Sequence, residues 1–283
     1  MKNCLILEGG GMRGVYTAGV LDYFNKKGLT FDCCIGVSAG ALHATRYLSN
    51  QPKKSFEITL KYLKDKEYCS IYSLIKTGNL FGVDLLYNKI PKEIAPLDND
   101  YFKKSKVEFR CVITDIKTGK PSYPVIKDFY KDMKYIQASS SLPLLAKNVL
   151  IDNKEYLDGG ISDSIPIKKA IELGYKKNIV ILTQPSDYIK KPSKANKLIA
   201  KKYKNYQGLV TAMENRHNMY NDTIKFINEQ EKLGNIFVIR PNQSLGIGRT
   251  EKNKDKLINA YHMGLEDACK NYNDLIKYLK END

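Results

Sequence analysis

Histidine is scarce in this sequence, and the residue types that bind metals are not clustered. The 283 residues include three histidines, and no group of His, Cys, Asp and Glu has the spacing of a metal site. No apolar run approaches the roughly 20 residues that a membrane span needs. The first apolar run, residues 4–7, ends at a glutamate and three glycines, so we expect no signal peptide. These absences argue against a metalloenzyme, a secreted protein and a membrane-spanning protein, and we expect no cofactor.

The sequence also lacks a disulfide or zinc-binding pattern. Six cysteines are present, but no two are spaced as Cys-x-x-Cys. Cys4, Cys33, Cys34 and Cys111 lie in apolar, strand-like runs, where a free thiol packs as a small hydrophobic side chain. Because side chains alternate along a strand, Cys33 and Cys34 are expected to point to opposite faces of a sheet. A reduced, cytoplasmic protein fits this pattern best.

Positive charge is in clear excess. Lys and Arg number 46 and Asp and Glu 31, which gives a formal net charge of +15. Such a surface suits nucleic acid, an anionic membrane or an acidic substrate. The lysines are scattered, so compositional drift explains the charge equally well. No recognition helix or aromatic nucleic-acid motif is present, and we expect no nucleic-acid partner. Peripheral contact with the anionic inner face of a membrane remains an explanation.

Apolar, strand-like runs alternate with amphipathic segments along the chain, which predicts an α/β fold with a mostly parallel sheet covered on both faces. We see no internal repeat, and residues 185–194 are the expected surface loop. Strands are expected at 4–7, 31–35, 107–114, 122–126, 148–152, 155–157, 178–183 and 236–240. Helices are expected at 15–26, 39–48, 135–141, 166–173, 208–233 and 255–280.

A Gly-x-Ser-x-Gly run is centred on Ser38, between an expected strand and an expected helix. A serine at a sharp strand-to-helix turn is exposed and strained, and its flanking glycines allow the two elements to approach closely. The helix dipole also favours an alkoxide-like nucleophile at this position. A small-residue turn is the alternative, but the strand–turn–helix context favours a nucleophilic serine.

A glycine-rich loop, Gly9–Gly14, follows the first strand. It fits the Gly-x-Gly-x-x-Gly pattern of dinucleotide-binding folds, which also require an acidic residue at the end of the second strand. Asp32 has about the right spacing but lies at the start of that strand, so we reject this interpretation. A glycine turn also presents free backbone N–H groups, and those of Gly10 and Gly11 would meet a negative oxygen near Ser38. Arg13 adds charge there or holds the loop.

A nucleophilic serine needs a base, and the histidines are poor candidates. His43 lies five residues beyond Ser38, about 140° around the helix, so it is expected to face away. His217 and His262 fall in polar or amphipathic helices and are expected to be surface or packing residues. Asp158 ends a strand and is followed by two glycines, so its carboxylate can reach the same sheet edge as Ser38. Alone, Asp-Gly marks a turn; beside the other two motifs it indicates the base.

Taken in order, these motifs resemble the patatin-like phospholipase family. The segment 138–143, Ala-Ser-Ser-Ser-Leu-Pro, also resembles a family segment, and 236–268 resembles bacterial cytoplasmic members. The resemblance implies a three-layer α/β/α fold and a Ser–Asp dyad that acts on lipid acyl esters without a metal. It assigns Ser38 as nucleophile and Asp158 as base. The oxyanion hole would be formed by Gly9, Gly10, Gly11, Met12, Arg13 and Gly14. The nucleophile elbow includes Gly36, Val37, Ala39 and Gly40, and the Asp-Gly-Gly motif ends in Gly159 and Gly160. One departure is Glu8, where many members have Asp.

The resulting hypothesis is a serine acyl hydrolase of the phospholipase A type that cleaves carboxylic esters of lipids or other long-chain acyl esters. The alternative is a lipid- or anion-binding regulatory protein with weak or vestigial esterase activity. Residues 4–166 are the expected core, and 167–283 an α/β continuation packed on it that does not fold alone. Residues 53–102 are helical in pattern and form either a cap over the site or ordinary amphipathic helices packed on the sheet.

Overall fold

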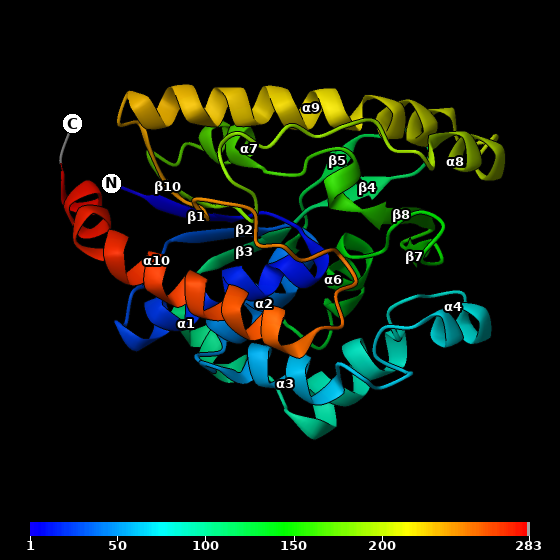
Figure 1. Cartoon of the computed structure of the whole chain (residues 1–283), viewed down its shortest axis with the longest axis horizontal. Helices are drawn as coiled ribbons and strands as arrows, with labels where there is room; N and C mark the ends of the chain where they lie inside the picture. Colours follow the sequence, from blue (N-terminus) through cyan, green and yellow to red (C-terminus); the bar gives the residue numbers. More distant parts are fainter. Residues whose placement is uncertain (282–283) are drawn as a thin grey trace.

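A six-stranded sheet forms the centre of the protein, seen in a computed structural model that describes residues 1–281 (Figure 1). The strand order is β10-β9-β1-β2-β3-β6, and every pair is parallel except β3 with β6. The strands are β1 (Asn3–Leu7), β2 (Cys33–Gly36), β3 (Glu108–Cys111), β6 (Val125–Ile126), β9 (Lys177–Ile181) and β10 (Ile236–Ile239). The expected mostly parallel sheet is therefore confirmed.

Helices cover both faces of this sheet, and α9 lies on the opposite side from α1, α2 and α10 (Figure 1). Because side chains alternate along a strand, Leu5 and Cys34 pack into the core beneath α1, whereas Ile6 and Cys33 pack into the core beneath α9. The three-layer α/β/α prediction is thus confirmed. These helices are α1 (Gly14–Lys26), α2 (Ala39–Leu48), α7 (Ile167–Glu172), α9 (Gln207–Lys232) and α10 (Lys254–Lys280).

The single strand predicted for residues 107–114 is wrong. The chain leaves the central sheet after Cys111, and β4 (Ile113–Asp115) belongs to a second, antiparallel sheet. The strand predicted at 122–126 is divided in the same way, between β5 (Pro121–Ser122) and β6. A continuous apolar run reveals burial but not the sheet to which each half belongs. The second sheet has the order β5-β4-β8-β7, with β7 (Val149–Ile151) and β8 (Lys154–Asp158).

The part of the chain after residue 166 adds its strands to the same central sheet. β9 lies between β1 and β10, and α10 packs closely on α1. A Cβ on Gly19 would lie 2.2 Å from the Tyr261 carbonyl oxygen, and one on Gly264 would lie 2.1 Å from that of Tyr16. Glycine therefore allows the two backbones to touch. That this part does not fold alone stays a prediction, which the shared sheet supports.

Four of the remaining helices come between β2 and β3 in the sequence. Residues 53–102 form α3 (Lys54–Tyr62), α4 (Ile71–Thr77), a π-helix η2 (Leu85–Ile94) and α5 (Asn99–Ser105). The others are η1 (Gly11–Arg13), α6 (Met133–Ser139), η3 (Gly159–Ile161) and α8 (Asn196–Lys202). Helix α8 was not predicted, because it is short and buries Ile199 alone. Within residues 1–281, no helix has both the length and the apolar character needed to cross a membrane.

Candidate active site

Ser38 occupies a strained turn between β2 and α2. Its φ is 53° and its ψ is −121°, a conformation that non-glycine residues rarely adopt. A Cβ on Gly36 would lie 2.6 Å from the Cα of Ala41, and one on Gly40 would lie 2.7 Å from the Leu7 carbonyl oxygen. Both glycines are therefore required by close backbone approach. The Ser38 side chain lines a cavity rather than the protein core.

Asp158 reaches the same cavity from the end of β8. Its side chain is buried, and its Oδ1 accepts a hydrogen bond of 2.8 Å from the Gly160 N–H. The Ser38 side chain lies beside the carboxylate and acts to lower the pKa of Asp158. Burial raises the pKa of Asp158 above its ordinary value, although the charge of Arg216, the Ser38 side chain and the hydrogen bond from Gly160 oppose that rise. The structure thus brings together the two residues that the sequence singled out.

Val112 and Gly159 hold the two sheets together beneath these residues. The Val112 N–H donates to the Gly36 carbonyl oxygen at 3.0 Å, directly before the Ser38 turn. A Cβ on Gly159 would lie 2.1 Å from the Val112 carbonyl oxygen, so glycine is needed there. One residue of the chain therefore contacts the backbone beside the serine and the backbone beside the aspartate.

The segment 138–143 positions both residues from a third direction. The Ser139 Oγ accepts the Ser38 N–H at 2.9 Å. The Ser141 carbonyl oxygen accepts the Asp158 N–H at 2.8 Å. The Ala-Ser-Ser-Ser-Leu-Pro segment thus has a structural role: it holds the backbones of Ser38 and Asp158 in place relative to one another.

The glycine loop lies against Ser38, since a Cβ on Gly9 would be 3.0 Å from the Ser38 Cβ. Three of the loop's amides are already used: Met12 N–H donates to Arg249, Arg13 N–H to Gly10, and Gly14 N–H to η1. The N–H groups of Gly9, Gly10 and Gly11 have no acceptor among the described residues, and the same holds for Ala39 at the start of α2. Four backbone N–H groups without an acceptor therefore belong to residues that line the same cavity as Ser38, one of them outside the loop.

Glu8 ties the base of this loop to the C-terminal part of the chain. The side chain is buried, and its Oε2 accepts hydrogen bonds from Thr183 N–H at 2.6 Å and Thr183 Oγ1 at 3.0 Å. Its Oε1 accepts from the Tyr220 hydroxyl at 2.8 Å. The position where many family members have Asp is thus a fully hydrogen-bonded structural carboxylate, and it makes no contact with Ser38 that would give it a role in the chemistry.

None of the three histidines is hydrogen-bonded to Ser38 or Asp158 within residues 1–281. His43 is buried beside Gly14, and its Nδ1 lies 2.6 Å from the Ser55 Oγ. Burial lowers the pKa of His43 to about 4, so the ring is neutral at physiological pH. His43 was expected to face away from Ser38, but it lines the same cavity. His262 is exposed on α10 and His217 lies on α9.

The cavity beside Ser38 has a volume of about 160 Å³ and an apolar wall. Much of that wall comes from residues 53–102, which therefore enclose the site as well as packing on the sheet. The side chains of this segment that line the cavity include Ile58, Phe81, Leu86, Tyr87, Ile90 and Leu97. The segment is close-packed around the π-helix, where the N–H of Ala95 donates to the Ile90 carbonyl oxygen five residues earlier.

Comparison with known proteins identifies this arrangement. The sequence profile described as "Patatin-like phospholipase" matches residues 5–171, more than half of the chain. The chain belongs to the patatin-like phospholipase family. A second profile, described as a domain of unknown function (DUF6363), matches residues 206–280.

Relatives of this patatin-like chain come from bacteria, viruses and fungi. It is 31% identical to "Uncharacterized protein YjjU" of Escherichia coli, over 85% of this chain and 69% of that protein. It is 25% identical to "Probable lipid hydrolase 463L" of Invertebrate iridescent virus 6, over 62% of this chain and 65% of the viral protein. It is also 25% identical to "Lysophospholipase nte1" of Aspergillus terreus, over 60% of this chain but 11% of that protein. The family and these relatives indicate a lipid hydrolase.

A structural comparison finds the crystal structure of VipD from Legionella pneumophila, with a TM-score of 0.49 and 13% identity, over 96% of this chain and 67% of that one. Within residues 1–281, no group of three or more His, Cys, Asp or Glu side chains is arranged to hold a metal ion.

Three basic side chains at the cavity were not predicted. Lys190 comes from the connection after β9, Arg216 from α9, and Arg249 from the connection before α10. Residues 185–194 are free of helix and strand, as expected, yet this loop also lines the site. No local motif marks these three positions among the 46 Lys and Arg residues of the chain. Their proximity arises from tertiary structure alone.

Proposed function

We propose that this chain is a serine acyl hydrolase that cleaves carboxylic esters of lipids through a Ser38–Asp158 dyad. The observation that carries the proposal is the strained Ser38 turn, whose side chain lies beside the buried Asp158 and next to a loop with unpaired backbone N–H groups. A nucleophile, a base and oxyanion donors are the three parts that acyl transfer requires.

The reaction would proceed in two halves. The Ser38 Oγ attacks the ester carbonyl carbon while Asp158 accepts the hydroxyl proton. The negative oxygen of the tetrahedral intermediate meets the free N–H groups of Gly10, Gly11 and Ala39. When the C–O bond breaks, the leaving alcohol takes the proton from Asp158 and an acyl-enzyme remains. Water then gives a proton to Asp158, its hydroxide oxygen attacks the acyl carbon, and the released Ser38 oxygen recovers the proton.

Burial makes an aspartate a better base than it is in water. An ordinary Asp has a pKa near 3.9 and accepts protons poorly at neutral pH. Burial raises the pKa of Asp158, and the direct contact with Ser38 removes the need for a histidine between them. The oxyanion donors would supply much of the remaining transition-state stabilisation.

The apolar wall of the cavity supports a long-chain acyl substrate, and hence a phospholipase A-type activity. Leu42, Leu86 and Ile90 belong to a lining that carries little charge on this side of Ser38. An acyl chain placed there gains about 0.8 kcal/mol for each buried methylene group. The carbonyl would then lie at the open end, next to the serine.

We expect a fluorophosphonate probe to label the protein and the label to disappear in Ser38→Ala. The probe reports an activated serine, and its stable adduct can be located by mass spectrometry of tryptic peptides. A lipid extract incubated with the wild-type protein should lose acylated species and gain free fatty acids. Labelling that survives the substitution would place the nucleophile elsewhere. A protein that neither reacts nor hydrolyses lipid would instead fit the regulatory, lipid-binding alternative.

Helix α4 is the segment that we propose for peripheral contact with an anionic membrane. Its Ile71 and Ile75 are 71% and 81% exposed and, four residues apart, share one face of the helix. Exposed isoleucines with lysines around them suit a lipid surface, which accepts apolar side chains and attracts cations. The helix lies at the edge of the molecule (Figure 1), between Tyr68 and Phe81, which both line the cavity. Lipid could therefore enter the apolar side directly.

Ile75→Glu should weaken binding to vesicles that contain anionic lipid by about 10-fold or more, since it loses one buried isoleucine and adds a repelled charge. Wild-type binding should also fall steeply between low and physiological salt. The matched control is Ile171→Glu on α7, where a partly exposed isoleucine lies on another face. Sedimentation with vesicles measures both. Equal losses in the two variants would remove α4 from the contact.

A further inference from the structure

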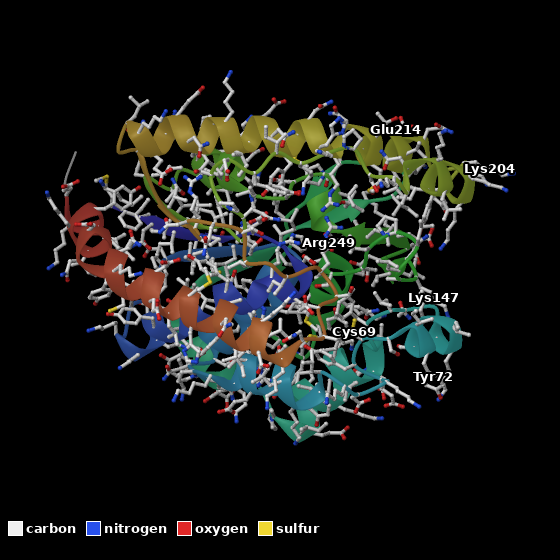
Figure 2. The ribbon with its side chains drawn as sticks, in the orientation of Figure 1. Cys69, Tyr72, Lys147, Lys204, Glu214 and Arg249 are labelled. Carbon is white, nitrogen blue, oxygen red and sulfur yellow. The ribbon has the colours of Figure 1, made fainter. Side chains whose placement is uncertain are left out.

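Four cationic side chains converge on one end of the cavity beside Ser38. They are Arg13, Lys190, Arg216 and Arg249, and they come from four separate parts of the chain. Figure 2 labels Arg249 near the centre of the molecule, on the connection between β10 and α10. None of the four has a carboxylate within ion-pair distance in the described part of the chain, whereas Lys and Arg elsewhere do form such pairs.

The nearby carboxylates are already occupied. Glu8, which attracts Arg13 and Lys190, holds hydrogen bonds from Thr183 and Tyr220. Asp158, which attracts Arg216, holds the contacts from Ser38 and Gly160 described above. Two carboxylates therefore lie near four cations. Neither Glu8 nor Asp158 forms an ion pair with any of the four.

This end of the cavity holds cations under unfavourable conditions. Burial and the charge of Arg216 lower the pKa of Lys190 to about 7, although its ammonium gains a cation–π contact 3.9 Å from the centre of the Tyr220 ring. Burial and Arg249 lower the pKa of Arg216 to about 10. The buried Arg13 Nε has no hydrogen-bond acceptor. An anion would relieve all three, because opposite charge favours the protonated forms and supplies acceptors.

We propose that Lys190, Arg216 and Arg249 bind the phosphate of the substrate's head group, so that the chain prefers phospholipids to neutral acylglycerols. This inference rests on the proposed hydrolase function. An ester whose acyl chain lies on the apolar wall and whose carbonyl lies at Ser38 extends its other end toward these cations. Guanidinium groups match phosphate oxygens in two-point contacts, and an ammonium adds a point charge. Arg216 is also bonded to the Gly160 carbonyl oxygen, so it links this subsite to Asp158.

Lys190→Gln tests the subsite with the least disturbance of Asp158, because Arg216 and Arg249 are among the main influences on the pKa of Asp158 and Lys190 is not. The substrates are a lysophosphatidic acid and a monoacylglycerol with the same acyl chain, in neutral detergent micelles. We expect kcat/KM for the phosphate substrate to fall about 10-fold or more, the scale of one charge-assisted hydrogen bond. Hydrolysis of the monoacylglycerol should stay within about twofold. The control is Lys191→Gln, an exposed neighbour whose loss should leave both rates unchanged.

Equal losses on both substrates, or no loss on either, would overturn the head-group assignment. A binding measurement separates this failure from failure of the hydrolase proposal, since Ser38→Ala protein should still bind lysophosphatidic acid in calorimetry even if no turnover exists. Glycerol 3-phosphate should bind more weakly and inorganic phosphate most weakly. If inorganic phosphate binds as tightly as lysophosphatidic acid, the cluster is a site for a free anion instead. If lysophosphatidic acid and the monoacylglycerol bind equally well, the head-group subsite is excluded.

Discussion

Asp158→Asn is expected to lower ester turnover roughly 10³-fold or more, to about the level of Ser38→Ala. The amide has nearly the size of the carboxylate and can still accept the Gly160 N–H, but it cannot take the serine proton. Initial rates with a short-chain ester and with lipid, measured at equal concentrations of folded protein, provide the comparison. Turnover within tenfold of the wild-type rate would show that Asp158 is not the base.

Three further measurements test the dyad against a hidden triad. His217→Gln and His262→Gln should each keep most activity; a folded variant as inactive as Ser38→Ala would make that histidine the base. Activity should fall as pH drops through the raised pKa of Asp158, because the protonated carboxyl cannot accept. A carboxyl whose pKa is raised on folding contributes stability below its unfolded pKa and loses it as pH rises. Asp158→Asn should therefore have a melting temperature at neutral pH no lower than that of the wild type.

Gly10→Val is expected to reduce turnover about 10²-fold while the protein stays folded. A Cβ at this position would lie 3.0 Å from the Thr183 Oγ1 and 3.3 Å from the Arg13 Cβ, so the larger valine side chain has to displace the loop or these neighbours. Loss of one oxyanion donor costs a rate factor of about 10²–10³. The φ of Gly10 is −163°, so Gly10→Val avoids the positive-φ strain that a side chain at Gly11 would meet.

Melting temperature and circular dichroism check that Gly10→Val is folded, and Gly10→Ala should show a smaller loss with the same sign. Gly11 is a poorer choice for substitution. Its φ is 58°, and an added Cβ would lie 2.6 Å from the Arg249 carbonyl oxygen, so misfolding could not be distinguished from the loss of a donor. Unchanged turnover in folded Gly10→Val would remove this loop from the mechanism.

The parts of the site that could be predicted are those encoded in short contiguous stretches. Ser38 with its glycines and the Gly9–Gly14 loop follow neighbouring parallel strands, which bring both to one edge of the central sheet. Asp158 was identified from its Asp-Gly-Gly motif, but it ends a strand of the second, antiparallel sheet, so the expected shared sheet edge does not explain its position. The backbone then has one way to make each turn, which is why the local sequence is informative. The free N–H of Ala39 was within reach of the same reasoning, since it begins the helix after the nucleophile.

What could not be predicted depends on contacts between distant segments. The chain passes from the central sheet to the second sheet at Val112, because the strands that pair with β3 differ from those that pair with β4. An apolar run in the sequence does not reveal its pairing partners. Lys190 and Arg249 belong to loops with no repeating pattern, and Arg216 looks like any charged residue on an amphipathic helix. The three-dimensional positions of basic residues are hard to infer when the whole chain is rich in lysine.

The hydrogen bonds of Glu8 make the assembly of the site depend on residues that are synthesised much later. Its carboxylate is held by Thr183 and Tyr220, which are added to the chain 175 and 212 residues later. At about 5–20 residues per second, a ribosome needs roughly 10–40 seconds to cover that distance. Until then β1 lacks its neighbour β9, and the glycine loop has no anchor. A nascent chain therefore carries Ser38 well before the anchor of the glycine loop exists, and the proposed site is complete only after residue 220 has been added.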